Sequence, residues 1–166
     1  MKQFAQLFAQ LDGATSTRYK VEALVAYFRQ APAGDAAWAV YFLSGGKPKR
    51  TVPTKTLREA ALAISGLPDW LFEECYQAVG DLAETIAHVL PLPAPAGGPL
   101  HDALGLSAWM TRRILPLRDM PADERLAEVV RYWQVLGATE RFLFVKLVGG
   151  GFRVGVSKLL VTRALA

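Results

Sequence analysis

Apolar residues recur along most of this chain at spacings of three and four positions. Phe4, Leu7, Phe8 and Leu11 show the pattern first, and residues spaced in this way share one face of an α-helix. The same spacing continues through most of the sequence, which predicts an all-α protein. Further helices are expected between residues 16 and 32, 35 and 45, 54 and 64, 68 and 80, 81 and 89, 106 and 115, 122 and 136, 139 and 148, and from about 157 onward.

Short polar residues stand where several of these helices should begin. Ser, Thr and Asp side chains accept hydrogen bonds from the free amides of a first helical turn, so they are favoured as N-caps. The segment 152–156 is short and rich in branched residues, and its pattern does not decide between a strand and a loop. The expected caps are Ser16 or Thr17, Asp35, Thr54, Asp81 and Ser157.

Proline and glycine crowd residues 91–99 and exclude regular structure there. A chain of 166 residues is long enough for one well-buried domain or two small lobes. The composition therefore predicts a two-lobed helical domain, with lobes at roughly 1–90 and 100–166 and a linker at 91–99.

The two predicted lobes resemble each other. Residues 35–46 (DAAWAVYFLSGG) align without a gap with residues 139–150 (TERFLFVKLVGG), which pairs Leu43 with Leu147. Each half then reads as two helices, a glycine-rich basic loop and another helix. Duplication would give a pseudo-two-fold internal repeat with two equivalent basic loops, whereas the alternative is a chance similarity between short segments.

Positive charge is concentrated in two places. The chain has 19 Lys and Arg against 15 Asp and Glu, a net charge of +4. Every charged residue from position 141 onward is basic, and a second group lies between residues 47 and 55. Such clusters favour a polyanionic partner, although solvated basic loops remain the alternative. The clustered cations are Arg141, Lys146, Arg153, Lys158 and Arg163 in one group and Lys47, Lys49, Arg50 and Lys55 in the other.

The segment 149–158 (GGGFRVGVSK) has the properties of a phosphate-binding loop. Glycines let backbone amides approach an anion closely. Ser157 can cap the next helix, whose positive end would then face the same anion as Arg153 and Lys158. The alternative is an ordinary helix end followed by an ordinary cap. Similar features recur at 45–55.

Several other kinds of site do not fit the sequence. Gly150 and Gly155 have P-loop spacing without the Gly-Lys-Ser/Thr continuation, and the expected helical neighbours disfavour a dinucleotide-binding turn. A lone Cys75 excludes an internal disulfide, and His88 and His101 lack metal-ligand spacing. No apolar run is long enough for a membrane span. The start of the chain lacks a secretory signal, which predicts a cytoplasmic location.

Three segments carry a resemblance to a known family. The end of the chain, GFRVGV at 151–156 followed by Leu160-Val161, and the stretch GDLAET at 80–85, which has Ala83 where the family has glycine, resemble motifs of the DNA ligase DNA-binding domain. The basic turn after Leu43 is similar to that family's glycine-rich turn. The resemblance spans nearly the whole chain and is closest to bacterial ATP-dependent ligases related to archaeal and eukaryotic replicative enzymes.

The resemblance implies a helical clamp that holds phosphates on either side of a nick across the minor groove of double-stranded DNA, without reading sequence. It assigns DNA contacts to one loop and the start of the helix after it, and a weaker set to the basic turn. The first set is Gly151, Phe152, Arg153, Gly155, Ser157 and Lys158. The second is Lys47, Lys49, Arg50, Thr54 and Lys55.

This chain itself is expected to be non-catalytic. Adenylyl transfer in such ligases uses a lysine in Lys-x-Asp-Gly, and none of the seven lysines stands in that motif. No cofactor is expected here, whereas the parent enzyme would need ATP and Mg²⁺ for its work in DNA replication, repair and recombination. The resemblance implies a monomer that contacts the ligase catalytic core. The alternatives are a helical protein–protein adaptor and an independent nucleotide-using enzyme.

Overall fold

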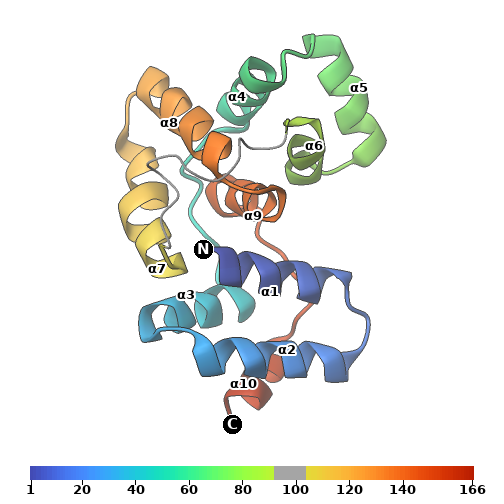
Figure 1. The fold of residues 1–166 in the computed structure, drawn as a ribbon, viewed down its shortest axis with the longest axis vertical. Helices are drawn as coiled ribbons and strands as arrows, with labels where there is room; N and C mark the ends of the chain where they lie inside the picture. Colours follow the sequence, from blue (N-terminus) through green and yellow to red (C-terminus); the bar gives the residue numbers. More distant parts are fainter. Residues whose placement is uncertain (92–103) are drawn as a thin grey trace.

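A computed structural model describes residues 1–91 and 104–166 of this protein. Within these two ranges the regular structure is entirely helical, and residues 152–156 form a loop, so the predicted all-α class is confirmed (Figure 1). The elements are α1 (Lys2–Gly13), α2 (Thr17–Gln30), α3 (Ala33–Leu43), α4 (Thr54–Ser65), α5 (Asp69–Val79), α6 (Leu82–Val89), α7 (Leu106–Trp109), a π-helical turn η1 (Met110–Ile114), a 3-10 turn η2 (Leu115–Asp119), α8 (Ala122–Val135), α9 (Ala138–Gly149) and α10 (Lys158–Leu165). No helix among these is long and apolar enough to cross a bilayer.

The helices form two groups that lie one above the other (Figure 1). In the lower group α2 packs on both α1 and α10, and α10 also contacts α3. In the upper group α4 packs against α8, and α6 packs against both α5 and α9. Contacts of α1 with α9 and of α3 with α7 join the groups.

These contacts divide the chain differently from the predicted lobes of 1–90 and 100–166. The last helix, α10, belongs with α1 to α3, while α4 to α6 belong with α8 and α9. Apolar faces pair wherever they cover each other best, and this need not follow chain order. Residues 92–99 of the predicted linker lie outside the described ranges, and no internal repeat is established.

Four phenylalanines connect the chain ends at the centre of the lower group. The Phe152 ring lies 5.0 Å from the Phe8 ring, 5.3 Å from that of Phe42 and 6.3 Å from that of Phe4. All four side chains are buried. Aromatic rings bury large apolar areas and favour such tilted and offset packing, so the segment before α10 is anchored on α1 and α3.

Three predicted caps are confirmed, and two are wrong. Ser16, Asp81 and Ser157 each accept a backbone hydrogen bond at the start of the next helix. Thr54 makes no cap, because α4 begins there after Pro53. Asp35 lies inside the first turn of α3, where its buried carboxylate instead accepts a 2.8 Å hydrogen bond from the Ser107 amide and caps α7.

Candidate nucleic-acid interface

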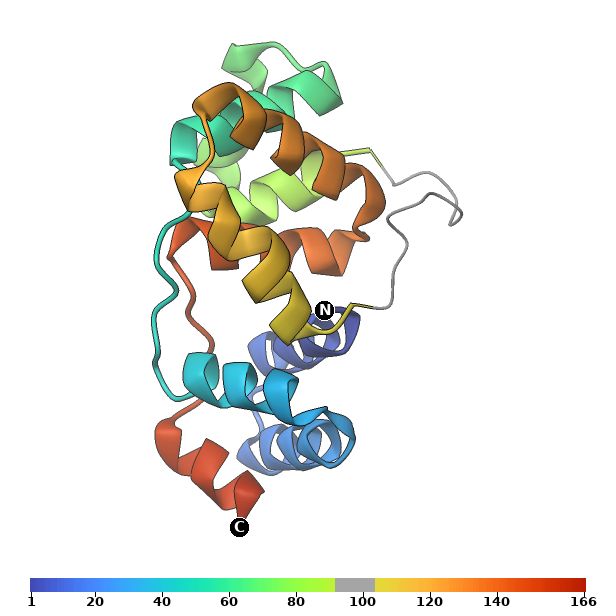
Figure 2. The ribbon, with the colours of Figure 1, turned by 90° about the vertical axis from the view of Figure 1, so that its left-hand side faces the viewer.

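The two glycine-edged basic loops lie side by side between the two groups of helices. The 44–53 loop leads from α3 up to α4, and the 150–157 loop leads from α9 down to α10, so the two run in opposite directions (Figure 2). The amides of Thr51 and Val52 donate to the carbonyl oxygen of Val148 at 2.9 and 3.2 Å. The Arg50 Nε donates to the Gly149 carbonyl oxygen at 3.3 Å. The fold thus brings together loops that are about a hundred positions apart in sequence.

Gly150 makes this close approach possible. It ends α9 with φ at 73°, in the left-handed region that other residues adopt only at a cost. A Cβ atom at this position would lie 3.3 Å from the Pro48 carbonyl oxygen and 3.4 Å from the Arg50 nitrogen. Both the backbone angle and the neighbouring loop therefore require glycine.

A compact turn fixes the start of the 44–53 loop. Gly45 has φ at 97°, and the Gly46 amide donates to the Tyr41 carbonyl oxygen at 2.8 Å. The Tyr41 hydroxyl then donates to the Lys47 carbonyl oxygen at 3.0 Å. These contacts hold the first basic residue of the loop against α3.

The structure buries one of the residues assigned to DNA contact. Phe152 is only 6% exposed and packs among Phe4, Phe8 and Phe42. Its aromatic side chain contributes to the core, so the ring offers little surface to a partner, and the DNA contact at this position stays a prediction. The neighbours Gly151 and Arg153 are exposed. The buried Phe152 ring anchors the loop, and these two residues face solvent.

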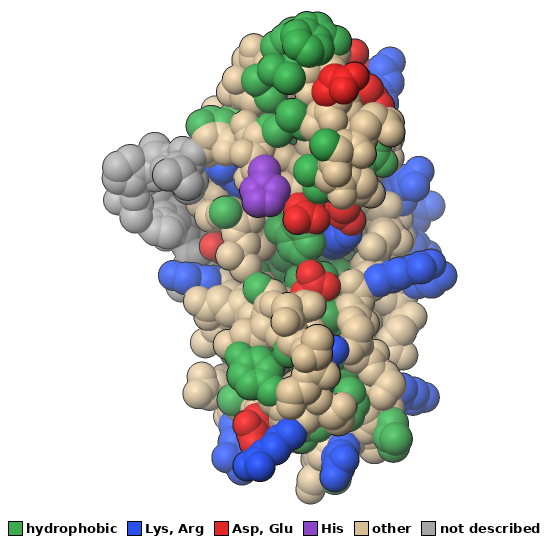
Figure 3. Space-filling view, turned by 90° about the vertical axis from the view of Figure 1, so that its right-hand side faces the viewer, with side chains coloured by type: hydrophobic (Ala, Val, Ile, Leu, Met, Phe, Trp, Pro, Cys, Tyr) green, Lys and Arg blue, Asp and Glu red, His purple; other side chains and the backbone are tan. Residues whose placement is uncertain are grey.

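The charged side chains assigned to DNA contact are all exposed. They come from both loops and from the first turns of the helices that follow, and they are Lys47, Lys49, Arg50, Lys55, Arg153 and Lys158. Among the described residues only Lys55 of this set forms an ion pair, to Glu59 at 3.8 Å. Lys and Arg side chains project at several heights along the right-hand edge of Figure 3, which is the left-hand edge of Figure 2, where the two loops lie.

The start of α10 combines a capped helix N-terminus with a lysine. The Ser157 side chain accepts from the Leu160 amide at 3.3 Å, and the first turn contains no acidic residue. The helix macrodipole places partial positive charge at this end, next to the Lys158 ammonium. Gly155 and Ser157 are exposed beside it, and Thr54 is exposed at the start of α4.

Lys20 is a neighbour of the loop that sequence reasoning missed. Its Nζ donates to the carbonyl oxygen of Gly155 at 2.6 Å, across 135 positions of sequence. Lys20 lies on α2, in a segment whose only sequence signal is the helical pattern. Its position therefore follows from the packing of α2 against α10.

Two cations of the predicted basic cluster have structural roles instead. Arg141 is 2% exposed and donates to the carbonyl oxygens of Trp133 and Pro91 at 2.7 and 2.6 Å. Burial lowers the pKa of Arg141, because the charged form loses hydration. Lys146 pairs with Asp81. Neither side chain is free for a polyanion, so the basic cluster is smaller than the sequence predicted.

The GDLAET stretch joins two helices of the upper group. Gly80 ends α5 with φ at 79°, and Asp81 caps α6 by accepting from the Glu84 amide at 2.9 Å. The same carboxylate pairs with Lys146 on α9. Partial burial alone would raise the pKa of Asp81, but the bonds from Lys146 and the Glu84 amide outweigh it and lower the pKa. This motif therefore stabilises the scaffold.

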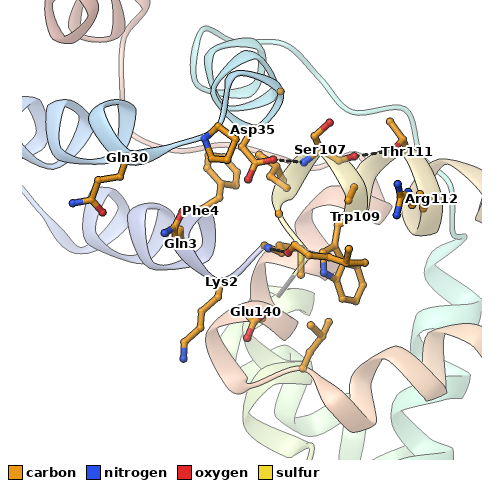
Figure 4. Close-up of a pocket in the computed structure, with 18 of the residues that line it drawn as sticks. Lys2, Gln3, Phe4, Gln30, Asp35, Ser107, Trp109, Thr111, Arg112 and Glu140 are labelled. Atoms are coloured by element: carbon orange, nitrogen blue, oxygen red, sulfur yellow. Dashed lines mark hydrogen bonds between the residues drawn. The ribbon is translucent and has the colours of Figure 1, made fainter. Parts of the chain in front are cut away.

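A cleft of about 830 Å³ lies between the start of α1, α3 and α7 (Figure 4). Its polar lining includes Lys2, Gln3, Asp35, Arg112 and Glu140. Figure 4 shows the Asp35 carboxylate directed at the backbone of α7. Across the described residues no three His, Cys, Asp or Glu side chains gather into a metal site.

Comparison with known proteins identifies a family. Residues 1–166, the whole chain, match the family model described as DNA ligase N terminus. A search among curated proteins found no match to this chain.

Proposed function

The chain belongs to the DNA ligase N-terminal family, and we propose that it serves DNA ligation by holding double-stranded DNA without reading its sequence. The observation that carries this proposal is the pair of adjacent loops, 44–53 and 150–157. Their hydrogen bonds through Val148 join two segments that are far apart in sequence, and these segments with the helix starts that follow them carry six exposed cations. Lys and Arg side chains in such an array bind phosphates and release condensed counterions.

The 44–53 loop and the start of α10 offer different groups to an anion, and both kinds of group can bind the phosphates of DNA. Lys47, Lys49 and Arg50 offer charge from the 44–53 loop, while the α10 start adds helix amides beside Lys158 and Arg153. These groups recognise phosphate and carry no information about base identity. We propose that they grip both sides of a nick across the minor groove.

In the proposed function, a separate catalytic core carries out adenylyl transfer. None of the seven lysines stands in Lys-x-Asp-Gly, so adenylyl transfer with ATP and Mg²⁺ would require a catalytic core beyond these residues. The role of this domain would be to position DNA for that core, as a monomer that contacts it.

The test is a fluorescence anisotropy titration of a nicked duplex over a range of salt concentrations. If about five or six phosphates are neutralised, log affinity should fall with log salt at a slope of roughly −5. Duplexes of unrelated sequence should bind alike, and an intact duplex only slightly less well. A salt-independent affinity, or no binding at all, would reject the proposal.

A further inference from the structure

An apolar groove of about 560 Å³ opens beside the 44–53 loop. It lies between α3, this loop and the segment from α7 to η2, and Figure 2 shows the arrangement of these three segments. Tyr41 is 49% exposed there and Leu115 is 38% exposed. The groove has no acidic residue in its lining, which includes Trp38, Tyr41, Pro48, Met110 and Leu115, with Lys47 and Lys49 at its basic edge.

Its aromatic wall is fixed in place. The Trp38 ring meets the Tyr41 ring edge-on at 6.1 Å and stacks on the Phe42 ring at 5.5 Å. The Tyr41 hydroxyl is already bonded to the Lys47 carbonyl oxygen. An occupant therefore meets a preformed apolar surface that offers few polar groups.

The charged edge is separate from this wall. Lys47 and Lys49 are exposed while Pro48 between them is buried, so both lysines leave the loop toward solvent. Neither forms an ion pair within the described residues. A ligand that fits this groove must present apolar groups to the aromatic wall and negative charge to Lys47 and Lys49.

We infer that the groove packs against the deoxyribose faces of one DNA strand while Lys47 and Lys49 hold its phosphates, an inference that rests on the proposed function. A DNA strand alternates apolar sugar carbons with phosphates. The basic row also continues past the groove through Arg50, which bonds to Gly149 at the end of α9, just before the 150–157 loop. A row of this length fits a long polyanion better than the short acidic flank of a peptide.

This arrangement makes the groove a determinant of sugar specificity. A ribose would bring a 2′-hydroxyl against Trp38 and Leu115, in a lining that is apolar apart from Ser107, the Trp38 indole N–H, the bonded Tyr41 hydroxyl and the lysines at the edge. Burying an unpaired hydroxyl costs binding free energy, and the 2′-hydroxyl is the group by which proteins distinguish RNA from DNA. The groove therefore favours deoxyribose in the strand that it contacts.

The first test separates apolar from ionic contacts. Leu115→Gln and Tyr41→Ser should each weaken binding to a nicked duplex about threefold to tenfold at every salt concentration, with the salt slope unchanged, because they remove apolar burial and no charge. Tyr41→Phe keeps the ring and loses only the hydroxyl bond to the Lys47 carbonyl oxygen, so it should bind more tightly than Tyr41→Ser. Trp70→Gln, at a residue 66% exposed on α5, is the matched control and should have no effect.

The second test places single ribonucleotides at successive positions of each strand. One or two adjacent positions in one strand should weaken wild-type binding about fivefold or more. Leu115→Gln should reduce that penalty, since its amide can pair with the hydroxyl. Urea unfolding of each variant checks that it is folded.

The outcomes separate deoxyribose packing in the groove from DNA binding by the domain as a whole. Wild-type protein that binds no duplex rejects both. Normal salt-dependent binding with unchanged affinity in Leu115→Gln and Tyr41→Ser rejects the groove inference alone and leaves the groove to an apolar peptide. A ribose penalty that Leu115→Gln does not alter also overturns it.

Discussion

The backbone amide of Thr51 donates a 2.9 Å hydrogen bond to the carbonyl oxygen of Val148. Val148 lies in the last turn of α9, where carbonyl groups lack partners within the helix. Thr51 belongs to the 44–53 loop and is buried. This hydrogen bond therefore gives one carbonyl group of the helix end a partner and helps to hold the two loops together.

Replacing Gly150 should destabilise the contact between the two loops. Gly150→Ala forces a side chain into a left-handed backbone conformation and against Pro48, which should cost about 1–2 kcal/mol of unfolding free energy. Gly151→Ala is the control, because a Cβ there has open space and its φ lies outside the left-handed region. Urea unfolding of both variants measures the difference, and equal midpoints would show that the close approach at Gly150 is tolerated.

Removing single loop charges should weaken DNA binding in proportion to the phosphates released. Arg153→Ala and Lys158→Ala should each reduce the salt slope by about one and lower affinity for all sequences alike. Arg18→Ala is the matched control. Its position, two residues before Lys20, turns it to the other side of α2, and it pairs with Glu22. If Arg18→Ala weakens binding as much as the loop variants, the loops are not the site.

Phe152 should affect stability more than DNA contact. Phe152→Ala should cost about 3–5 kcal/mol by emptying a buried aromatic site, and Phe152→Leu should cost less. Among folded molecules Phe152→Leu should retain wild-type DNA affinity, because the side chain lies inside the core. Anisotropy below the unfolding transition measures this. A large affinity loss with little loss of stability would restore Phe152 to the interface.

The Asp81–Lys146 pair should make stability depend on pH. Since folding lowers the pKa of Asp81, the contribution of its carboxylate is fully present above the unfolded value of about 4 and is lost as pH falls through the lower folded value. Asp81→Asn keeps a good N-cap but removes the charge. It should cost about 1 kcal/mol at neutral pH, a figure reduced for the exposure of Asp81, and nothing at strongly acidic pH.

Urea unfolding across this pH range makes the comparison. Asp123→Asn, at an exposed position in the first turn of α8, controls for charge removal near a helix start. A pH dependence that persists in Asp81→Asn would assign it to other carboxylates.

Local sequence signals predicted much of the helical structure. The apolar spacing and the Ser16, Asp81 and Ser157 caps depend on residues within a turn of each other, and the structure confirms them. Asp35 misled the prediction because its carboxylate caps a helix 72 positions away. Local spacing contains no information about such a partner.

The helical class, the glycines at the loop edges, the excess of cations and the lack of Lys-x-Asp-Gly could all be read from the amino-acid order. Which cations stay exposed depends on the packed fold: it buries Arg141, pairs Lys146 with Asp81 and brings Lys20 to Gly155. The fold also turns Phe152 inward and sets the two loops side by side. Helix periodicity and turn chemistry act over a few residues, whereas burial and ion pairing depend on which distant faces meet.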